Sequence, residues 1–194
     1  YDNIQKPLKN IYTRFSAGLL EEMFGGVGGE VLYRPFDSNF AIGADLYWVK
    51  QRSYDGMLDF EDYDVITGHT TFYLQEPRSN VLLRIIGGRY LAKDSGFTID
   101  VSRRFQSGLS MGIFASKTDI SSAEFGEGSF DKGFYFNMPL EIFFQNYSKA
   151  VTGYGLRPIT RDGAQRLITG YDLWGVTNSA SFNTLNRTKG YIYD

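Results

Sequence analysis

The chain has 194 residues, a formal net charge of −2 and no cysteine, which excludes thiolate metal sites, a disulfide framework and a strongly basic nucleic-acid-binding surface. Aromatic residues make up 16% of the chain, and there are 22 glycines. No run approaches the roughly 18 apolar residues that a transmembrane helix needs. Many aromatic residues and glycines, with a negative mean hydropathy, instead favour a transmembrane β-barrel.

The N-terminal quarter predicts a polar lead-in followed by three strands. Residues 1–10 are polar and form the expected lead-in. Apolar and polar side chains then alternate, as in a strand with two different faces, over 11–20, 30–34 and 40–51. The glycine-rich segment 21–29 predicts a chain reversal, and Pro35 begins a predicted turn.

The middle of the chain carries the clearest alternation. It predicts five strands, at 63–75, 81–90, 97–105, 109–118 and 134–142. A charged loop is expected at 52–62, a tight turn at Gln106-Ser107-Gly108, and a polar loop at 119–132.

The C-terminal part predicts two more strands, at 150–157 and 166–176, before a polar tail or final strand at 177–194. About ten strands result, within a range of eight to twelve, and each has roughly the ten residues that a tilted strand needs to cross a bilayer. Short turns at Pro35, Pro77 and Ser107 contrast with longer acidic loops, as in outer-membrane proteins. The expected fold is all-β, an antiparallel up-and-down transmembrane β-barrel over residues 11–176.

The polar face of these strands carries charges of both signs in near balance. A barrel of this size has a narrow interior filled by side chains, and charges buried there must be paired. We therefore interpret the following residues as a structural network of ion pairs and hydrogen bonds in the lumen: Arg14, Glu30, Asp45, His69, Arg84, Asp100, Arg104 and Glu141.

Other polar residues suggest chemistry only weakly. His69 is the only histidine, which excludes a histidine-based metal site, and no serine stands in a nucleophile-elbow context. The carboxylates of the two predicted outer loops fit neither an EF-hand nor the spacing of a glycosidase pair, and we interpret them as solvated: Asp59, Glu61, Asp62, Glu124, Glu127 and Asp131. The residues predict no metal and no cofactor.

Several short motifs, in order between residues 14 and 167, resemble the YjbH/GfcD (WbfB-like) family of exopolysaccharide and capsule proteins of Gram-negative bacteria. They are Glu22 to Pro35, Gly43-Ala44-Asp45-Leu46 with Gln51-Arg52, Thr67-Gly68-His69, Gly88-Arg89-Tyr90-Leu91-Ala92 with Asp100 and Ser102-Arg103-Arg104-Phe105, Phe125 to Gly133, and Arg157-Pro158 with Thr160-Arg161-Asp162-Gly163.

The resemblance implies an outer-membrane β-barrel lipoprotein encoded with polysaccharide-export genes. This chain would be its C-terminal portion, and the lipidated cysteine would lie outside it. The implied role is non-catalytic, with outer-membrane lipid, polysaccharide and periplasmic or outer-membrane export proteins as partners, and polymer contact as a second role of the lumen residues. The family supplies no catalytic residues to carry over.

Two rival functions remain open at this stage. One is an outer-membrane acyl hydrolase with His69 as base, which needs a serine within hydrogen-bond reach of that histidine. The other is a soluble, lipocalin-like ligand-binding barrel, in which the apolar face would point inward and the charged face outward. The location of the aliphatic face distinguishes the second rival from a membrane barrel.

Overall fold

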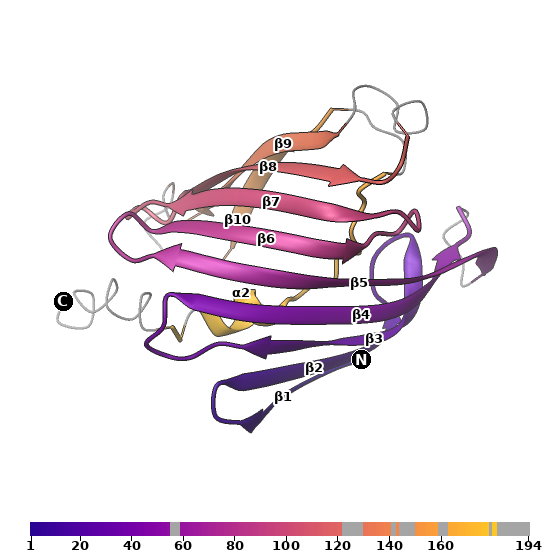
Figure 1. The fold of residues 1–194 in the computed structure, drawn as a ribbon, viewed down its shortest axis with the longest axis horizontal. Helices are drawn as coiled ribbons and strands as arrows, with labels where there is room; N and C mark the ends of the chain where they lie inside the picture. Colours follow the sequence, from indigo (N-terminus) through magenta and orange to yellow (C-terminus); the bar gives the residue numbers. More distant parts are fainter. Residues whose placement is uncertain are drawn as a thin grey trace.

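The computed structural model describes residues 1–54, 59–121, 130–140, 143, 150–158, 163–178 and 180–181. They form one antiparallel sheet of ten strands in sequence order, each paired with its neighbours along the chain (Figure 1). The strands are β1 (Asp2–Leu8), β2 (Ile11–Leu19), β3 (Phe24–Tyr33), β4 (Phe40–Arg52), β5 (Phe60–Glu76), β6 (Val81–Arg89), β7 (Ser95–Arg104), β8 (Ser110–Thr118), β9 (Asp131–Pro139) and β10 (Val151–Leu156). A short helix, α2 (Leu173–Asn178), follows them.

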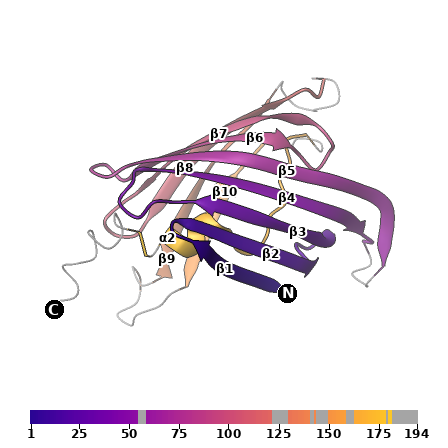
Figure 2. The same cartoon turned by 60° about the horizontal axis from the view of Figure 1, so that its bottom comes forward.

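The all-β, up-and-down order that the alternation predicts is confirmed. Within the described residues, however, β1 pairs only with β2 and β10 only with β9, so the sheet is open. It curves strongly, and Figure 2 shows it arching over α2. No helix in the described part of the chain is long and apolar enough to cross a membrane.

Three sequence predictions of local structure are wrong in whole or in part. The expected lead-in is strand β1, paired with β2. The reversal expected over 21–29 is confined to the residues between Leu19 of β2 and Phe24 of β3, because the glycine run lies inside β3 and pairs with both β2 and β4. Its glycines permit close approach: a Cβ on Gly26 would lie 2.1 Å from the carbonyl oxygen of Trp48, and one on Gly28 would lie 2.2 Å from the Tyr47 ring. The expected last strand, 166–176, is instead irregular chain leading into α2.

The loop boundaries also differ from expectation. The connection predicted at 52–62 is shorter than expected, because β4 continues to Arg52 and β5 already begins at Phe60. The predicted loop 119–132 ends one residue before Asp131, where β9 begins. The tight turn before β8 is present, and its Gly108 has a positive φ of 85° that favours glycine. Residues 55–58, 122–129 and 182–194 lie outside the description.

The two faces of the sheet differ in chemistry. The outer face is apolar and exposed; Leu46 and Ile113, for example, are 64% and 62% exposed. It also carries Phe15, Val31, Ile42, Trp48, Ile66, Phe72, Ile85, Phe97, Ile99, Met111 and Phe134. The inner face carries the buried charged and hydroxyl side chains, together with a few apolar ones. The period-two alternation therefore assigns the two faces correctly.

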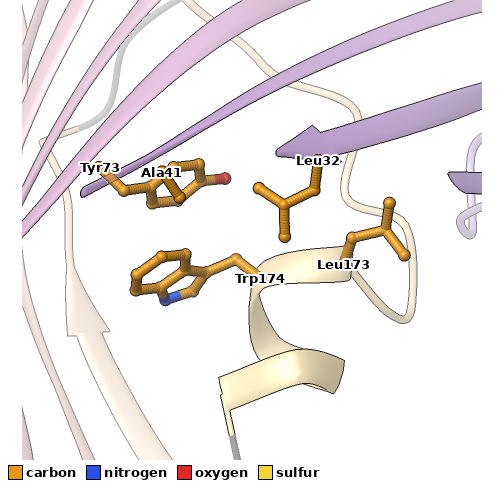
Figure 3. Packing of buried hydrophobic residues seen from close by; sticks show 5 residues of the cluster. All are labelled: Leu32, Ala41, Tyr73, Leu173 and Trp174. Atoms are coloured by element: carbon orange, nitrogen blue, oxygen red, sulfur yellow. The ribbon is translucent and has the colours of Figure 1, made fainter. Parts of the chain in front are cut away.

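The buried apolar residues lie between the inner face and the C-terminal segment 163–178, which we call the inner segment. Leu173 and Trp174 of this segment pack against Leu32, Ala41 and Tyr73 of the sheet (Figure 3). Further along, Leu167 packs against the cluster around Val49 and Val65, and Ala164 against Tyr90. The small core of the molecule is thus formed by the sheet and this one crossing segment.

Candidate functional site: the polar inner face of the sheet

The inner segment has almost no regular structure, so its backbone groups need partners from elsewhere. Carboxylates of the sheet and its connections accept hydrogen bonds from its amides. The pairs are Ala164 N to Asp94 Oδ2 at 2.8 Å, Ile168 N to Glu21 Oε2 at 2.7 Å, and Leu173 N to Glu30 Oε2 at 2.9 Å. These bonds hold the segment along a path from the β6–β7 connection to β3. These three carboxylates therefore fix the inner segment against the sheet.

Arg14 of β2 fastens the middle of the inner segment. Its Nε donates to Asp2 Oδ1 at 2.8 Å, and its Nη1 donates to Thr169 Oγ1 at 3.0 Å and also to the carbonyl of Tyr171. The residue is 4% exposed. Asp2 lies in β1, so this arginine joins the first strand, the second strand and the inner segment.

Arg34, just beyond β3, fastens the helical end. Its guanidinium lies 3.8 Å from the centre of the Trp174 ring and donates to the Trp174 carbonyl at 3.1 Å and to Asn178 Oδ1 at 3.0 Å. A cation at a helix C-terminus is electrostatically favourable. Burial lowers the pKa of Arg34 to about 10, which still leaves it protonated at neutral pH. Tyr73 stacks on Trp174 with ring centres 4.3 Å apart (Figure 3).

Other charged side chains of the inner face pair with one another. Arg84 of β6 and Asp100 of β7 are cross-strand neighbours with a 2.9 Å ion pair, and the Tyr135 hydroxyl lies 3.1 Å from both Asp100 carboxylate oxygens. Arg157 binds Asp131 through two hydrogen bonds, the Nε one at 2.8 Å. Paired charges of this kind are the form in which a buried charge is tolerated.

The predicted lumen residues are largely brought together. Arg14, Glu30, Asp45, His69, Arg84 and Asp100 all lie on the inner face, and Arg84 forms an ion pair with Asp100. Arg104 shares this face but is exposed at the end of β7. Glu141 lies outside the described residues. Arg14 and Glu30 are cross-strand neighbours, yet their polar contacts go to Asp2 and to the inner segment.

The predicted loop carboxylates have mixed outcomes. Asp59 is exposed in the β4–β5 connection, whereas Glu61 and Asp62, also exposed, belong to strand β5. Asp131 is not a solvated loop residue: it is 1% exposed and paired with Arg157. The alternation of 131, 133, 135 and 137 with apolar 134, 136 and 138 could have placed it on the inner face. Glu124 and Glu127 lie outside the described residues.

His69 has no environment suited to acyl transfer within the described residues. Its Nδ1 lies 3.3 Å from Asp45 Oδ1, and its ring packs edge-on against Tyr90 with centres 4.8 Å apart. Nε2 is buried, and no described residue forms a hydrogen bond with it, so the serine that a hydrolase needs is not among them. No group of three or more potential metal ligands occurs in the described part of the chain.

The fold and the side chains of the inner face together define the structural class of this protein. It is a curved, open antiparallel sheet with an apolar outer surface, and the inner segment of the same chain occupies its polar interior. The family described as "Exopolysaccharide biosynthesis protein YbjH" matches residues 1–179. The chain belongs to this YjbH family, which confirms the resemblance noted in its motifs.

Among curated proteins, the chain is similar to an "uncharacterized lipoprotein YjbH" of Escherichia coli strain K12. The two are 43% identical over 176 residues, which is 89% of this chain and 25% of the relative. The chain therefore spans about a quarter of the length of that relative. No solved structure matches significantly.

Proposed function

We propose that the ten strands form part of the wall of a bacterial outer-membrane β-barrel that serves exopolysaccharide or capsule secretion without catalysing a reaction. The single observation that carries this proposal is the distribution of side chains between the two faces. Large apolar residues cover the exposed outer face, while arginine, aspartate and histidine are buried inside. A membrane barrel distributes its residues in this way.

The alternatives fit this distribution less well. A soluble lipocalin-like barrel would need the charged face in water and the apolar face inside, which is the reverse of the observed exposures. Isolated exposed apolar residues are ordinary on soluble proteins, but a continuous apolar face is not. Lipid is the surrounding that such a face fits best, and the lipoprotein name of the relative agrees with the cell envelope.

A barrel wall also requires a closed sheet, because unpaired strand edges are not tolerated in lipid. Among the described strands, the unpaired edges are those of β1 and β10. In the proposal, strands from the remainder of a longer protein, such as the one this chain matches over a quarter of its length, complete the wall. The β4–β5 and β8–β9 connections would face outside and contact polymer, and export proteins would bind at the periplasmic end.

The experiment compares insertion of the complete protein and of two variants into phosphatidylcholine vesicles, measured by heat-modifiable gel migration. Ile113→Arg places a charge in the middle of β8 on the outer face, where an arginine facing lipid costs about 2–4 kcal/mol. We expect it to lower the inserted fraction at least tenfold. Tyr54→Arg, in the exposed β4–β5 connection, is the matched control and should insert normally.

Equal insertion of Ile113→Arg and the unaltered protein would contradict the membrane assignment, as would a monomer that stays soluble without detergent. The secretion role is measured separately, in cells that lack the gene and are complemented with either variant. Cell-surface polymer should be lost with Ile113→Arg and kept with Tyr54→Arg.

A further inference from the structure

A second feature of the inner face is a cavity of about 370 Å³ beside α2, near the ends of β5, β6 and β7. Its volume lies within the roughly 300–1,000 Å³ typical of small-molecule sites. Strands β7 to β9 supply one wall, and the helical end of the inner segment supplies the other. The side chains that matter for its chemistry are Gln75, Arg84, Arg104, Tyr135, Asn137 and Trp174.

Three of these polar side chains are not committed to other described residues. The guanidinium of Arg104, the amide of Gln75 and the amide of Asn137 form no side-chain hydrogen bond within the described part of the chain. Arg84 and Tyr135, by contrast, are held rigidly by Asp100 and by each other, with the Arg84 Nη2 3.2 Å from the Tyr135 hydroxyl. The lining of the cavity thus combines two side chains fixed by hydrogen bonds with three whose donors and acceptors are not used by other described residues.

The charges around the cavity leave a positive excess. The charge of Arg84 is matched by Asp100. Of the remaining charged groups that line the cavity, Arg103 and Arg104 are cations and Asp172 is an anion, which leaves one net positive charge. Arg103 Nε already donates to the carbonyl of Ser79 at 3.1 Å. Arg104 is therefore the cation that is best placed to receive a ligand anion.

The aromatic groups offer little stacking surface. Tyr73 covers one face of the Trp174 ring at 4.3 Å and the Arg34 guanidinium lies over the ring at 3.8 Å, so the two occupy its opposite faces. Sugar recognition by stacking on Trp174 is thus blocked. Recognition has to come from the guanidinium and the two amides, which suit a carboxylate and neighbouring hydroxyl groups respectively.

We propose that this cavity binds one acidic sugar unit, with its carboxylate on Arg104 and its hydroxyls on Gln75 and Asn137. This inference rests on the proposed role in polysaccharide secretion and adds the chemical class of the polymer. A guanidinium pairs with a carboxylate through two parallel hydrogen bonds, a geometry that a neutral sugar cannot reproduce. The cavity accordingly selects among sugars first by the negative charge of the ligand and second by the arrangement of its hydroxyl groups.

Isothermal titration calorimetry of the complete, folded protein with trigalacturonate tests the proposal. The fully methyl-esterified trimer keeps the same sugar backbone without its charges, and sodium sulfate supplies an anion without sugar. We expect trigalacturonate to bind at least tenfold more tightly than either. Arg104→Gln should weaken trigalacturonate binding about tenfold, and Asn137→Ala should weaken it severalfold. Arg78→Gln removes an exposed arginine near the same end of the sheet, outside the cavity, and should leave binding unchanged.

Three comparisons of binding would overturn the assignment, in addition to a complete absence of binding. The first is equal binding of the trimer and its methyl ester, the second is equal binding of sulfate, and the third is an equal loss in Arg78→Gln and Arg104→Gln. Absence of binding to protein that still shows heat-modifiable migration would also overturn it. That last outcome leaves the membrane and secretion assignment intact, because vesicle insertion and surface polymer are measured independently.

Discussion

The outer and inner faces of the sheet come from the same ten strands, yet different interactions shape them. On the outer face, neighbouring apolar side chains of adjacent strands lie side by side, and the strand pairing alone determines their positions. On the inner face, several buried groups, among them Arg14, Arg34 and Asp94, bond to the inner segment, whose residues are as many as 157 positions away along the chain, as between Arg14 and Tyr171. The outer face is thus set by local periodicity and the inner face by distant contacts.

The two faces should also contribute differently to the stability of the fold. Side chains on the outer face are exposed to the medium around the molecule, so their contribution to the free energy of unfolding depends on whether that medium is water, detergent or lipid. Inner residues are enclosed within the protein by the sheet and the inner segment, so substitutions there should lower stability in any surrounding. Three substitutions, ordered by expected effect, test this contrast.

Trp174→Ala should produce the largest loss of stability, because it removes the stacking on Tyr73, the contact with the Arg34 guanidinium and the tryptophan's share of the apolar cluster with Leu32. Replacing a buried tryptophan by alanine costs about 3–5 kcal/mol. Urea unfolding followed by far-ultraviolet circular dichroism measures the change, since that signal comes mainly from the backbone and remains usable without the tryptophan.

Val176→Ala is the matched control on the same helix, because Val176 is 41% exposed, and its cost should stay below about 1 kcal/mol. If Trp174→Ala were as stable as this control, the inner segment would not hold the inner face together.

The two faces were also unequally predictable. Alternation in the sequence was enough to place Ile99, Ile113 and Phe134 outside and Asp100 and Arg84 inside, because side chains in a strand point to opposite faces in turn. The sequence also predicted a last strand over 166–176, after the turn at 160–163, although Leu167-Ile168 and Leu173-Trp174 interrupt any alternation there. Residues 166–176 lie against the inner face of the sheet, where side chains such as those of Arg14 and Glu30 bond to them and no neighbouring strand pairs with them in the described part of the chain. The sequence of the segment does not reveal this position.

Other errors have physical reasons of their own. Glycine runs usually indicate reversals, but at Gly26 and Gly28 glycine makes room for β4 and the Tyr47 ring. Asp2 looked like part of a polar lead-in, yet it binds Arg14 and Ser16 across a strand pair. In both cases the residues that explain the local structure lie on a neighbouring strand. The residue pattern within one segment carries no information about such neighbours.

Asp131→Asn should cause an intermediate loss of stability. Its control is Asp59→Asn, because the sequence predicted that both aspartates are solvated loop residues. Asp131→Asn removes the charge from a carboxylate that is 1% exposed and bonded to Arg157, whereas Asp59→Asn changes an exposed carboxylate in a connection. Hydrogen bonds to charged groups contribute about 1.5–3 kcal/mol. The Arg157 side chain is 34% exposed, so water screens the pair and the loss should be near the low end of that range.

Asp59→Asn should change the free energy of unfolding by less than about 0.5 kcal/mol. Both variants can be compared in the same urea titration. Equal stabilities would mean that Asp131 behaves as the solvated loop residue that the sequence predicted, and that the pair with Arg157 adds nothing.

The smallest expected effect is on the pH dependence of stability, and it comes from Glu21. This residue lies between β2 and β3 and accepts a hydrogen bond from the amide of Ile168 in the inner segment. Burial raises the pKa of this carboxyl above its ordinary value of 4.5, although the bond to Ile168 acts in the opposite direction. The folded state therefore binds the proton more tightly than the unfolded state does. Stability should decline as the pH rises from about 4.5 through the raised pKa, and stay lower above it.

Glu21→Gln keeps an oxygen that can accept from Ile168 but removes the titration. Because Glu21 is only half-buried, water reduces the effect, and the pH-dependent part should be less than about 1 kcal/mol. Urea titrations at a series of pH values should show a shallower decline for the variant than for the unaltered protein. An unchanged slope would mean that Glu21 is not buried against the inner segment, and that the bonds of Asp94, Arg14 and the other partners hold this segment without it.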